Sequence, residues 1–174
     1  GNVALGDTAL DDGSLSGGNN TAIGSAAMSA HTSGNNNTAV GHVALLSNTT
    51  GFSNVTVGGR SLDANTTGAQ NTALGYQALS ANTTSSNNTA VGYQSLYANT
   101  TGTDTTAIGS GALYSASTAV SNTAVGKNAL NATTGSYNTG VGHGSLALNT
   151  TGADNTALGF YSLLVNTSGA YNTA

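Results

Sequence analysis

Few side chains in this sequence could serve acid–base or nucleophilic chemistry. The 174 residues contain six Asp and three His, with neither Glu nor Cys. Catalysis requires unlike titratable groups brought together, and the many Ser and Thr residues have no neighbouring base with an orienting acid. Asp7, Asp11 and Asp12 form a group of carboxylates, but a calcium site needs about six to eight oxygens. We therefore expect a solvated loop here, and neither an enzyme nor a bound metal or other cofactor.

An internal repeat determines which elements position the side chains. The motif Asn-Thr-Ala-φ-Gly, in which φ is Val, Ile or Leu, or a close variant of it, recurs at intervals of 16 to 18 residues, most often 17. We number the positions of one repeat as columns 1 to 17, beginning with this Asn. Such regularity indicates a stack of equivalent structural units. The motif begins at Asn2, Asn20, Asn37, Asn54, Asn71, Asn88, Thr105, Asn122, Asn138, Asn155 and Asn172.

A repeat of this length and composition favours a β-solenoid. Seventeen residues are too few for a helical hairpin, and abundant Thr, Val, Gly and Asn disfavour helix. We predict an all-β fold, a parallel β-solenoid or β-roll of about ten 17-residue coils, which spans residues 1–174 as one domain. Coils about 4.8 Å apart would form a rod of roughly 50 Å. Because the array starts and stops inside a repeat, we expect an excerpt of a longer repeat protein.

Two columns carry large aliphatic side chains and are predicted to form the core. Column 4 is always Val, Ile or Leu, and column 9 is Leu in nine copies and Met in the other. With column 4 inward, strand alternation turns column 2 inward and column 3 outward. The predicted core ladder is Leu5, Ile23, Val40, Val57, Leu74, Val91, Ile108, Val125, Val141 and Leu158 from column 4, with Leu10, Met28, Leu45, Leu62, Leu79, Leu96, Leu113, Leu130, Leu146 and Leu163 from column 9.

The glycine of column 5 is invariant. It follows the predicted strand, where a corner needs positive φ or has no room for a Cβ. Asn-Thr-Thr-Gly at columns 12 to 15 fits the opposite corner, because Asn bonds its own backbone and Gly turns the chain. One residue is added near Asp11 to Ser14 and one is lost near Asn131 and Ala132, both outside the strand. The corner glycines are Gly6, Gly24, Gly41, Gly58, Gly75, Gly92, Gly109, Gly126, Gly142 and Gly159.

Small residues in columns 3 and 8 suggest a contact between chains. If both columns face outward, they form stripes suited to close approach of a sister chain in a homotrimer. The alternative is an exposed flat surface whose small residues serve only tight coiling. The candidate interface consists of Ala22, Ala39, Ala73, Ala90, Ala107, Ala124 and Ala157.

Columns 6 and 7 vary and carry bulky residues beside the invariant Gly, which indicates an exposed edge. Tyr76 and Tyr93 belong to consecutive coils, so their rings can stack, and Phe160 and Tyr161 lie farther along. These four residues are a candidate ligand edge for glycans or a receptor, although simple capping of the edge is the alternative. His42 and His143 share column 6 but lie about 29 Å apart along the axis. His31 replaces the Asn of column 12, and we expect it at a solvated corner.

The motif, as in Asn37 to Gly41, resembles the head repeat of trimeric autotransporter adhesins. Similar arrays occur in phage tail-fibre-like and other bacterial surface proteins, and the resemblance covers essentially the whole chain. It implies a left-handed parallel β-roll wound as a homotrimer. The period here is longer than in the adhesins, and one fewer residue separates Asn from Gly. Carried over by position, Val40, Val91 and Ile108 point inward, Gly41, Gly92 and Gly109 form the corner, and Ala39, Ala90 and Ala107 point outward.

The resulting functional hypothesis is a structural or adhesive segment of an extracellular fibre, located at a cell or virion surface. Expected partners are further copies of the chain, as a homotrimer or an end-to-end filament, and a host or matrix surface with its glycans. Arg60 and Lys127, the only two basic residues, cannot neutralise a nucleic-acid backbone. No apolar run is long enough to span a membrane. The alternative is an ice-binding solenoid, against which stands the predicted inward direction of the column-2 Thr residues.

Overall fold

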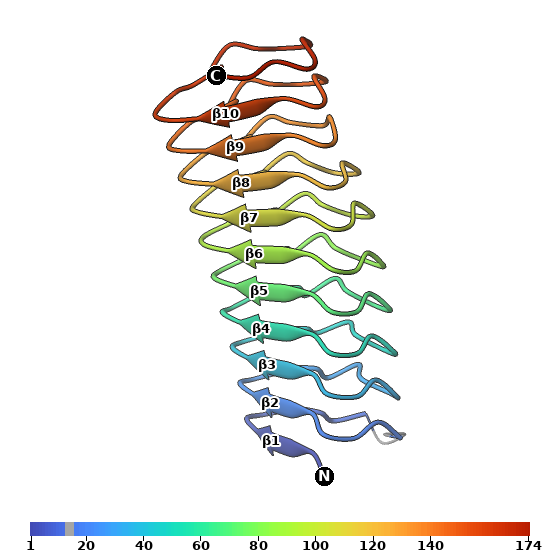
Figure 1. Ribbon diagram of the computed structural model, residues 1–174. Helices are drawn as coiled ribbons and strands as arrows, with labels where there is room; N and C mark the ends of the chain where they lie inside the picture. Colours follow the sequence, from blue (N-terminus) through green and yellow to red (C-terminus); the bar gives the residue numbers. More distant parts are fainter. Residues whose placement is uncertain (13–15) are drawn as a thin grey trace.

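The chain forms one parallel β-solenoid. The computed structural model describes residues 1–12 and 16–174, and among these residues there is no helix. Figure 1 shows coils stacked along a single axis, with one short strand of each coil aligned on the same side. The ten strands form one sheet whose order follows the sequence, β1 to β10. The predicted fold class is therefore confirmed, with nine turns connecting the ten strands.

Each strand consists of columns 2 to 4 and pairs in parallel with the same columns of the next coil. Thr72 lies opposite Thr89, and Leu74 lies opposite Val91, so identical columns form ladders. The spacing of 17 residues between partners sets this register. The strands are β1 (Val3–Leu5), β2 (Thr21–Ile23), β3 (Thr38–Val40), β4 (Val55–Val57), β5 (Thr72–Leu74), β6 (Thr89–Val91), β7 (Thr106–Ile108), β8 (Thr123–Val125), β9 (Thr139–Val141) and β10 (Thr156–Leu158).

The core combines the column-9 side chains with the small residues of columns 3 and 8. Met28 and the Leu residues from Leu45 to Leu146 in column 9 have no exposed surface, whereas Leu163 is partly buried. From Leu10 to Leu146, the amide of each column-9 residue donates to the column-8 carbonyl of the next coil, as in Leu79 N to Ser95 O at 3.0 Å. These Leu residues have positive φ, +54° at Leu79. Burial of the aliphatic side chain offsets the cost of this left-handed backbone.

The predicted directions of columns 3 and 4 are wrong. Ala73 and Ala90 of column 3 have no exposed surface, whereas Val57 of column 4 is 42% exposed and Leu158 is 71% exposed. The reason is space inside a narrow coil. At Gly140, which occupies column 3 of β9, a Cβ would lie 2.9 Å from Ser145 Oγ and 3.1 Å from Leu130 Cγ. The column therefore holds Ala or Gly, apart from Thr56, which is buried with its Oγ1 donating to Thr38 O at 3.2 Å. The residues that leave the predicted core are Leu5, Ile23, Val40, Val57, Leu74, Val91, Ile108, Val125, Val141 and Leu158.

This reversal also removes the predicted interface. Side chains without exposed surface in the coil cannot contact a sister chain, and column 8 is buried as well, for example at Ala78 and Ser95. Ser95 Oγ donates to Gly92 O at 3.1 Å, so the Ser residues of column 8 are satisfied inside their own coil. The seven residues wrongly predicted to face a sister chain are Ala22, Ala39, Ala73, Ala90, Ala107, Ala124 and Ala157.

Two ladders of buried Asn side chains connect the coils from within. In column 1, Asn71 Oδ1 accepts hydrogen bonds from Asn88 N at 3.0 Å, and Asn71 Nδ2 donates to Ser85 O at 2.9 Å. In column 12, Asn82 Nδ2 donates to Asn65 Oδ1 at 2.8 Å. Among the described residues, no buried side-chain polar atom lacks a partner. The amide groups therefore satisfy backbone groups that the small core would otherwise leave buried and unpaired.

The corner glycines have the backbone that the sequence predicts. Gly92 has φ of +130°, and a Cβ there would lie 2.7 Å from the backbone carbon of Gly109 in the next coil. Both positive φ and close approach between coils exclude a side chain. The predicted extra residue near Asp11 to Ser14 falls partly outside the described residues. The residue lost between Asn122 and Asn138 belongs to column 14, because Thr134 N and Gly135 N both donate to Thr150 O. It lies farther along than the predicted position near Asn131 and Ala132.

Candidate functional site

The outer side of the sheet is the most regular surface of the protein. We call the outward side chains of columns 2 and 4 on β1 to β10 the sheet face. Thr of column 2 and Val, Ile or Leu of column 4 alternate with the inward column 3 along every strand, with Val replacing Thr at Val3 and Val55. Because partners are in register, each column repeats at the coil spacing of about 4.8 Å. The sheet face therefore presents two parallel ladders.

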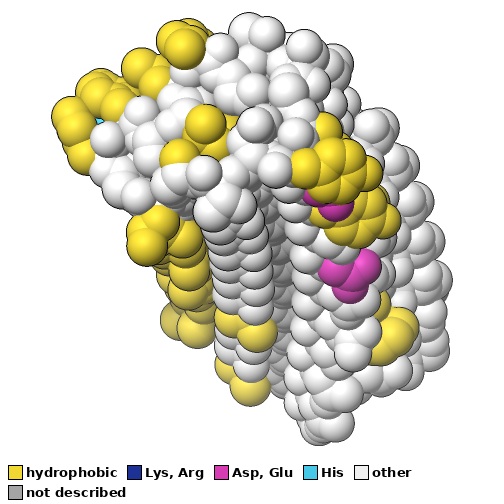
Figure 2. Space-filling model, turned by 45° about the horizontal axis from the view of Figure 1, so that its top comes forward, with side chains coloured by type: hydrophobic (Ala, Val, Ile, Leu, Met, Phe, Trp, Pro, Cys, Tyr) yellow, Lys and Arg dark blue, Asp and Glu magenta, His cyan; other side chains and the backbone are white. Residues whose placement is uncertain are grey.

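The sheet face is uncharged and rich in methyl groups. No Asp, Lys, Arg or His occupies column 2 or column 4 in any coil. Figure 2 shows hydrophobic side chains following one another along the axis beside a straight column of uncoloured ones. Ile23 and Ile108 are exposed by more than a third, and the central Val residues are partly exposed. This contiguous apolar strip is therefore a candidate interaction surface.

The predicted ligand edge contains a stacked aromatic pair. The Tyr76 and Tyr93 rings have centroids 6.0 Å apart and an interplanar angle of 10°. Between the same coils, Gln94 Nε2 donates to Gln77 Oε1 at 2.9 Å. Each ring thus covers one face of its neighbour, which is the arrangement expected for capping, while about half of each side chain stays exposed. The geometry allows either contact with a ligand or simple capping.

The other two residues of that edge form a second cluster with His143. Phe160 and Tyr161 have ring centroids 4.2 Å apart, and the His143 ring lies 5.5 Å from Phe160 and 5.2 Å from Tyr161. The structure thus brings together Phe160, Tyr161 and His143, but it does not join them to Tyr76 and Tyr93. A further stacked pair, Tyr97 and Tyr114 at 5.1 Å, was missed from the sequence. Its signal was two Tyr residues in column 10 of consecutive coils.

His31 is buried, so the predicted solvated corner is wrong. Its Nε2 lies 2.8 Å from Gly34 O, and its Nδ1 lies 3.1 Å from Asn48 Nδ2. The tautomer that fits both contacts donates from Nε2 and accepts at Nδ1. His31 therefore takes the place of the column-12 Asn in its ladder. Its Nδ1 accepts from Asn48 of the next coil, and its Nε2 donates to the corner carbonyl of Gly34.

The remaining titratable residues do not converge. Among residues 1–12 and 16–174, no three His or Asp residues come close enough to hold a metal ion. His42 and His143 occupy the same column six coils apart. The one ion pair of the described chain joins the exposed Arg60 side chain to the largely buried Asp63 at 3.3 Å. The residues that the structure describes also enclose no pocket.

Comparison with known proteins adds no identification. No family model, curated protein or solved structure matches the chain. The residues that the structure describes include no helix long and apolar enough to cross a membrane. The sheet face and the aromatic edges of the solenoid are the surface features that a function can use.

Proposed function

We propose that this chain is a non-catalytic structural segment of an extracellular fibre, and that copies of it associate laterally through the sheet face into a homotrimer. The observation that carries this proposal is the uncharged aliphatic ladder of column 4, which faces outward in all ten strands. The role requires a rigid rod with a repeated contact surface. A solenoid with in-register strands and internal amide ladders supplies both.

The energetics favour association along the whole length of the ladder. Full burial of a large aliphatic side chain contributes roughly 1.5 to 3 kcal/mol, so covering its exposed part contributes about 0.5 to 1.5 kcal/mol. One or two such contacts cannot offset the association cost of about 4 to 15 kcal/mol. Ten coils acting together contribute about 5 to 15 kcal/mol, which offsets it. Lateral contact engages every coil, whereas end-to-end stacking engages only the terminal ones.

The resemblance of the repeat to adhesin heads and tail-fibre arrays supports a location at a cell or virion surface. In such a fibre, columns 6 and 7 would face the surroundings. The Tyr76 and Tyr93 pair and the cluster of Phe160 and Tyr161 are the candidate contacts to a host or matrix surface, with glycans as the candidate ligands. If Tyr76→Ala with Tyr93→Ala leaves glycan or surface binding unchanged, the first of these contacts is capping only.

The deciding experiment is sedimentation equilibrium of the purified chain. We expect a species of three times the 16.8 kDa chain mass. Val91→Lys places a charge on the sheet face and should weaken association at least tenfold, because an ammonium group would be desolvated against apolar partners. Thr84→Lys, at the exposed opposite corner, is the matched control and should leave the trimer intact. A wild-type chain that stays monomeric at high concentration would refute lateral association, and filaments would indicate axial stacking.

Ice binding is the second candidate function, because the column-2 Thr side chains face outward and not inward as predicted. Thr72, Thr89 and Thr106 lie on consecutive strands and repeat at a constant spacing beside aliphatic side chains. A flat, uncharged ladder of hydroxyl and methyl groups can order water in a regular array. A thermal-hysteresis measurement tests this candidate. Activity that is lost in Thr89→Lys and kept in Thr84→Lys would replace the fibre role, whereas no activity would remove the candidate.

A further inference from the structure

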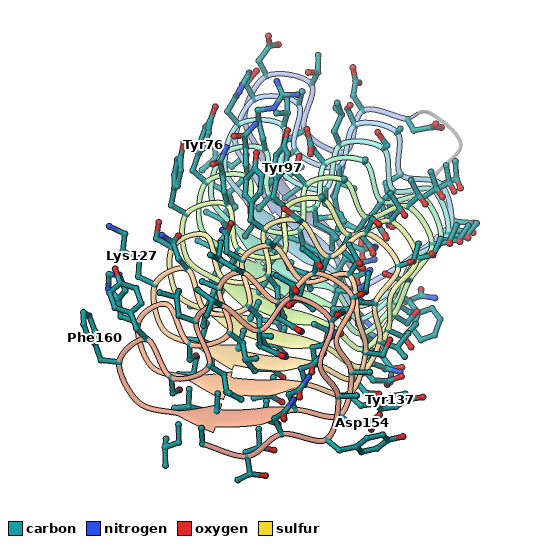
Figure 3. All side chains as sticks on the ribbon, turned by 90° about the horizontal axis from the view of Figure 1, so that it is seen from above. Tyr76, Tyr97, Lys127, Tyr137, Asp154 and Phe160 are labelled. Carbon is teal, nitrogen blue, oxygen red and sulfur yellow. The ribbon has the colours of Figure 1, made fainter. Side chains whose placement is uncertain are left out.

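A ridge beside the sheet face carries aromatic and acidic side chains in alternation. Column 17 contributes Tyr137, Asp154 and Tyr171 from three consecutive coils. Figure 2 shows acidic side chains lying between hydrophobic ones on a ridge to the right of the ladders. In Figure 3, Tyr137 and Asp154 project together from one side of the coil, whereas Lys127 and Phe160 project from the opposite side. In seven coils the same column holds only Asn, Ser, Gln or Asp, at Asn19, Asn36, Ser53, Gln70, Asn87, Asp104 and Ser121.

The backbone holds these three side chains at fixed spacing. Tyr171 N donates to Ala153 O at 3.2 Å, and Asp154 N donates to Ser136 O at 3.3 Å, so each residue is attached to the coil before it. Their φ angles, from +56° to +61°, place them in the left-handed region. Asn and Asp tolerate this region, and a bulky ring does so only at a cost. The two Tyr residues are therefore not the choice that backbone preference alone would make.

The functional groups of the ridge are not used within the protein. Tyr137 is 59% exposed and Tyr171 is 83% exposed. Within the described part of the chain, neither ring packs against another ring, and the Asp154 carboxylate has no ion pair or hydrogen bond. These features separate the ridge from the Tyr76 and Tyr93 pair, whose rings stack on each other.

The electrostatics favour a cation as the ligand. Lys127 lies at the opposite edge of the coil, and Arg60 pairs with Asp63, so no basic side chain compensates Asp154. Tyr137 and Tyr171 lie one coil step, about 4.8 Å along the axis, to either side of Asp154. Aromatic faces attract cations, and quaternary ammonium groups are recognised by aromatic side chains. A nearby carboxylate adds the attraction of an opposite charge.

We propose that Tyr137, Asp154 and Tyr171 form a binding site for an organic ammonium group, such as a methylated or free amine on a partner surface. The site lies outside the sheet face and does not depend on the fibre role. Because it is exposed, each chain binds such a cation only in the millimolar range. Presentation on several copies of the chain would raise the apparent affinity by linking weak contacts.

The experiment is an NMR titration of the chain labelled with ¹³C in its seven Tyr rings. The probe is tetramethylammonium chloride at constant ionic strength, with 2,2-dimethylpropanol as a neutral probe of similar shape. We expect saturable shifts at Tyr137 and Tyr171 with the cation alone. Asp154→Asn keeps a residue that tolerates positive φ and should raise the dissociation constant at least fivefold. Asp104→Asn, on the same ridge three coils away, is the matched control and should change nothing.

Three results would overturn the proposal. Equal shifts with the neutral probe would show a hydrophobic contact. A response to methyl β-glucoside without a response to tetramethylammonium would assign the site to sugars. An unchanged dissociation constant in Asp154→Asn, with a native circular dichroism spectrum, would remove the carboxylate from the site. None of these readouts depends on the oligomeric state, so failure here leaves the sedimentation test of the fibre role intact.

Discussion

The directions of columns 3 and 4 can be tested with two substitutions at adjacent positions of β6. Ala90→Val adds two methyl groups on the inward side, and Val91→Ala removes two methyl groups on the outward side. By equivalence with Gly140, the Cβ of Ala90 already packs against Leu79 of the preceding coil and Ser95 of its own. Neither Ala90, Leu79 nor Ser95 has exposed surface. The added methyl groups must therefore displace these neighbours, to the extent already accommodated at Thr56, the β-branched residue buried in the same column of β4.

The two substitutions should differ clearly in free energy of unfolding. Overpacking of a well-filled core costs about 1 to 3 kcal/mol, and we expect Ala90→Val near the middle of this range, because stacked coils restrict relaxation but column 3 accepts the β-branched Thr56 in β4. Val91 is partly exposed, so its truncation should cost less than about 1 kcal/mol in a monomer. With a urea dependence of about 2 kcal/mol per molar, Ala90→Val lowers the unfolding midpoint by about 1 M or more. Val91→Ala lowers it by less than about half of that.

Urea unfolding followed by far-ultraviolet circular dichroism measures both effects. Each variant should be measured at two protein concentrations tenfold apart, because association through the sheet face makes stability depend on concentration. In that case the cost of Val91→Ala grows with concentration while that of Ala90→Val does not. A larger cost for Val91→Ala at every concentration, with a neutral Ala90→Val, would refute the outward direction of column 4.

Three further substitutions probe the interior. Asn71→Ala removes the acceptor of Asn88 N and the donor to Ser85 O and should cost about 2 kcal/mol or more, measurable as a lowered thermal midpoint. Gly92→Ala forces a Cβ at φ of +130° against the next coil, and it should reduce the yield of folded protein or its urea midpoint by more than Asn71→Ala does. His31→Asn restores the common residue of its column and should change the free energy of unfolding by less than about 1 kcal/mol, whereas a loss of several kcal/mol would contradict the assigned ladder.

The repeat made most of the fold predictable, because ten near-identical copies show which positions share one environment. The period gives the coil and the strand register, and the invariant Gly gives the corner. Placing large aliphatic side chains in the interior is correct for column 9 but fails for column 4. The informative signal was constancy of size. Column 3 is Ala in eight coils, with one Gly and one Thr, whereas column 4 accepts Val, Ile and Leu.

The candidate sites were less predictable than the fold. His31 was assigned to solvent because the column-12 Asn was expected at an exposed turn, yet that column is buried and connects the coils. The stacking of Tyr76 on Tyr93 could be expected, since equal columns of consecutive coils are neighbours. The positive φ of column 17 could not be expected from the sequence, because its Asn, Ser, Gln and Tyr residues show no single backbone preference. Sequence columns identify neighbours along the axis but do not identify which groups remain unpaired.

The amide ladders and the backbone ladder make separate contributions to the solenoid, as the coil that begins at Thr105 shows. Here Thr105 replaces the column-1 Asn and Ala116 replaces the column-12 Asn, and Thr105 Oγ1 donates back to Thr103 O at 3.1 Å. The backbone ladder nevertheless continues through this coil, with Thr106 N donating to Asn122 O at 2.9 Å and Leu113 N to Ala129 O at 3.0 Å. In a stack where each coil contacts only its neighbours, stability is a sum of local terms. Burial of Leu and Ala together with backbone pairing is therefore sufficient to continue the stack. The Asn side chains add hydrogen bonds to the corner carbonyls. Residues of the outward columns take part in this stack through their backbone alone, so their side chains are free to be the Thr, Tyr and Asp residues on which the proposed contacts rely.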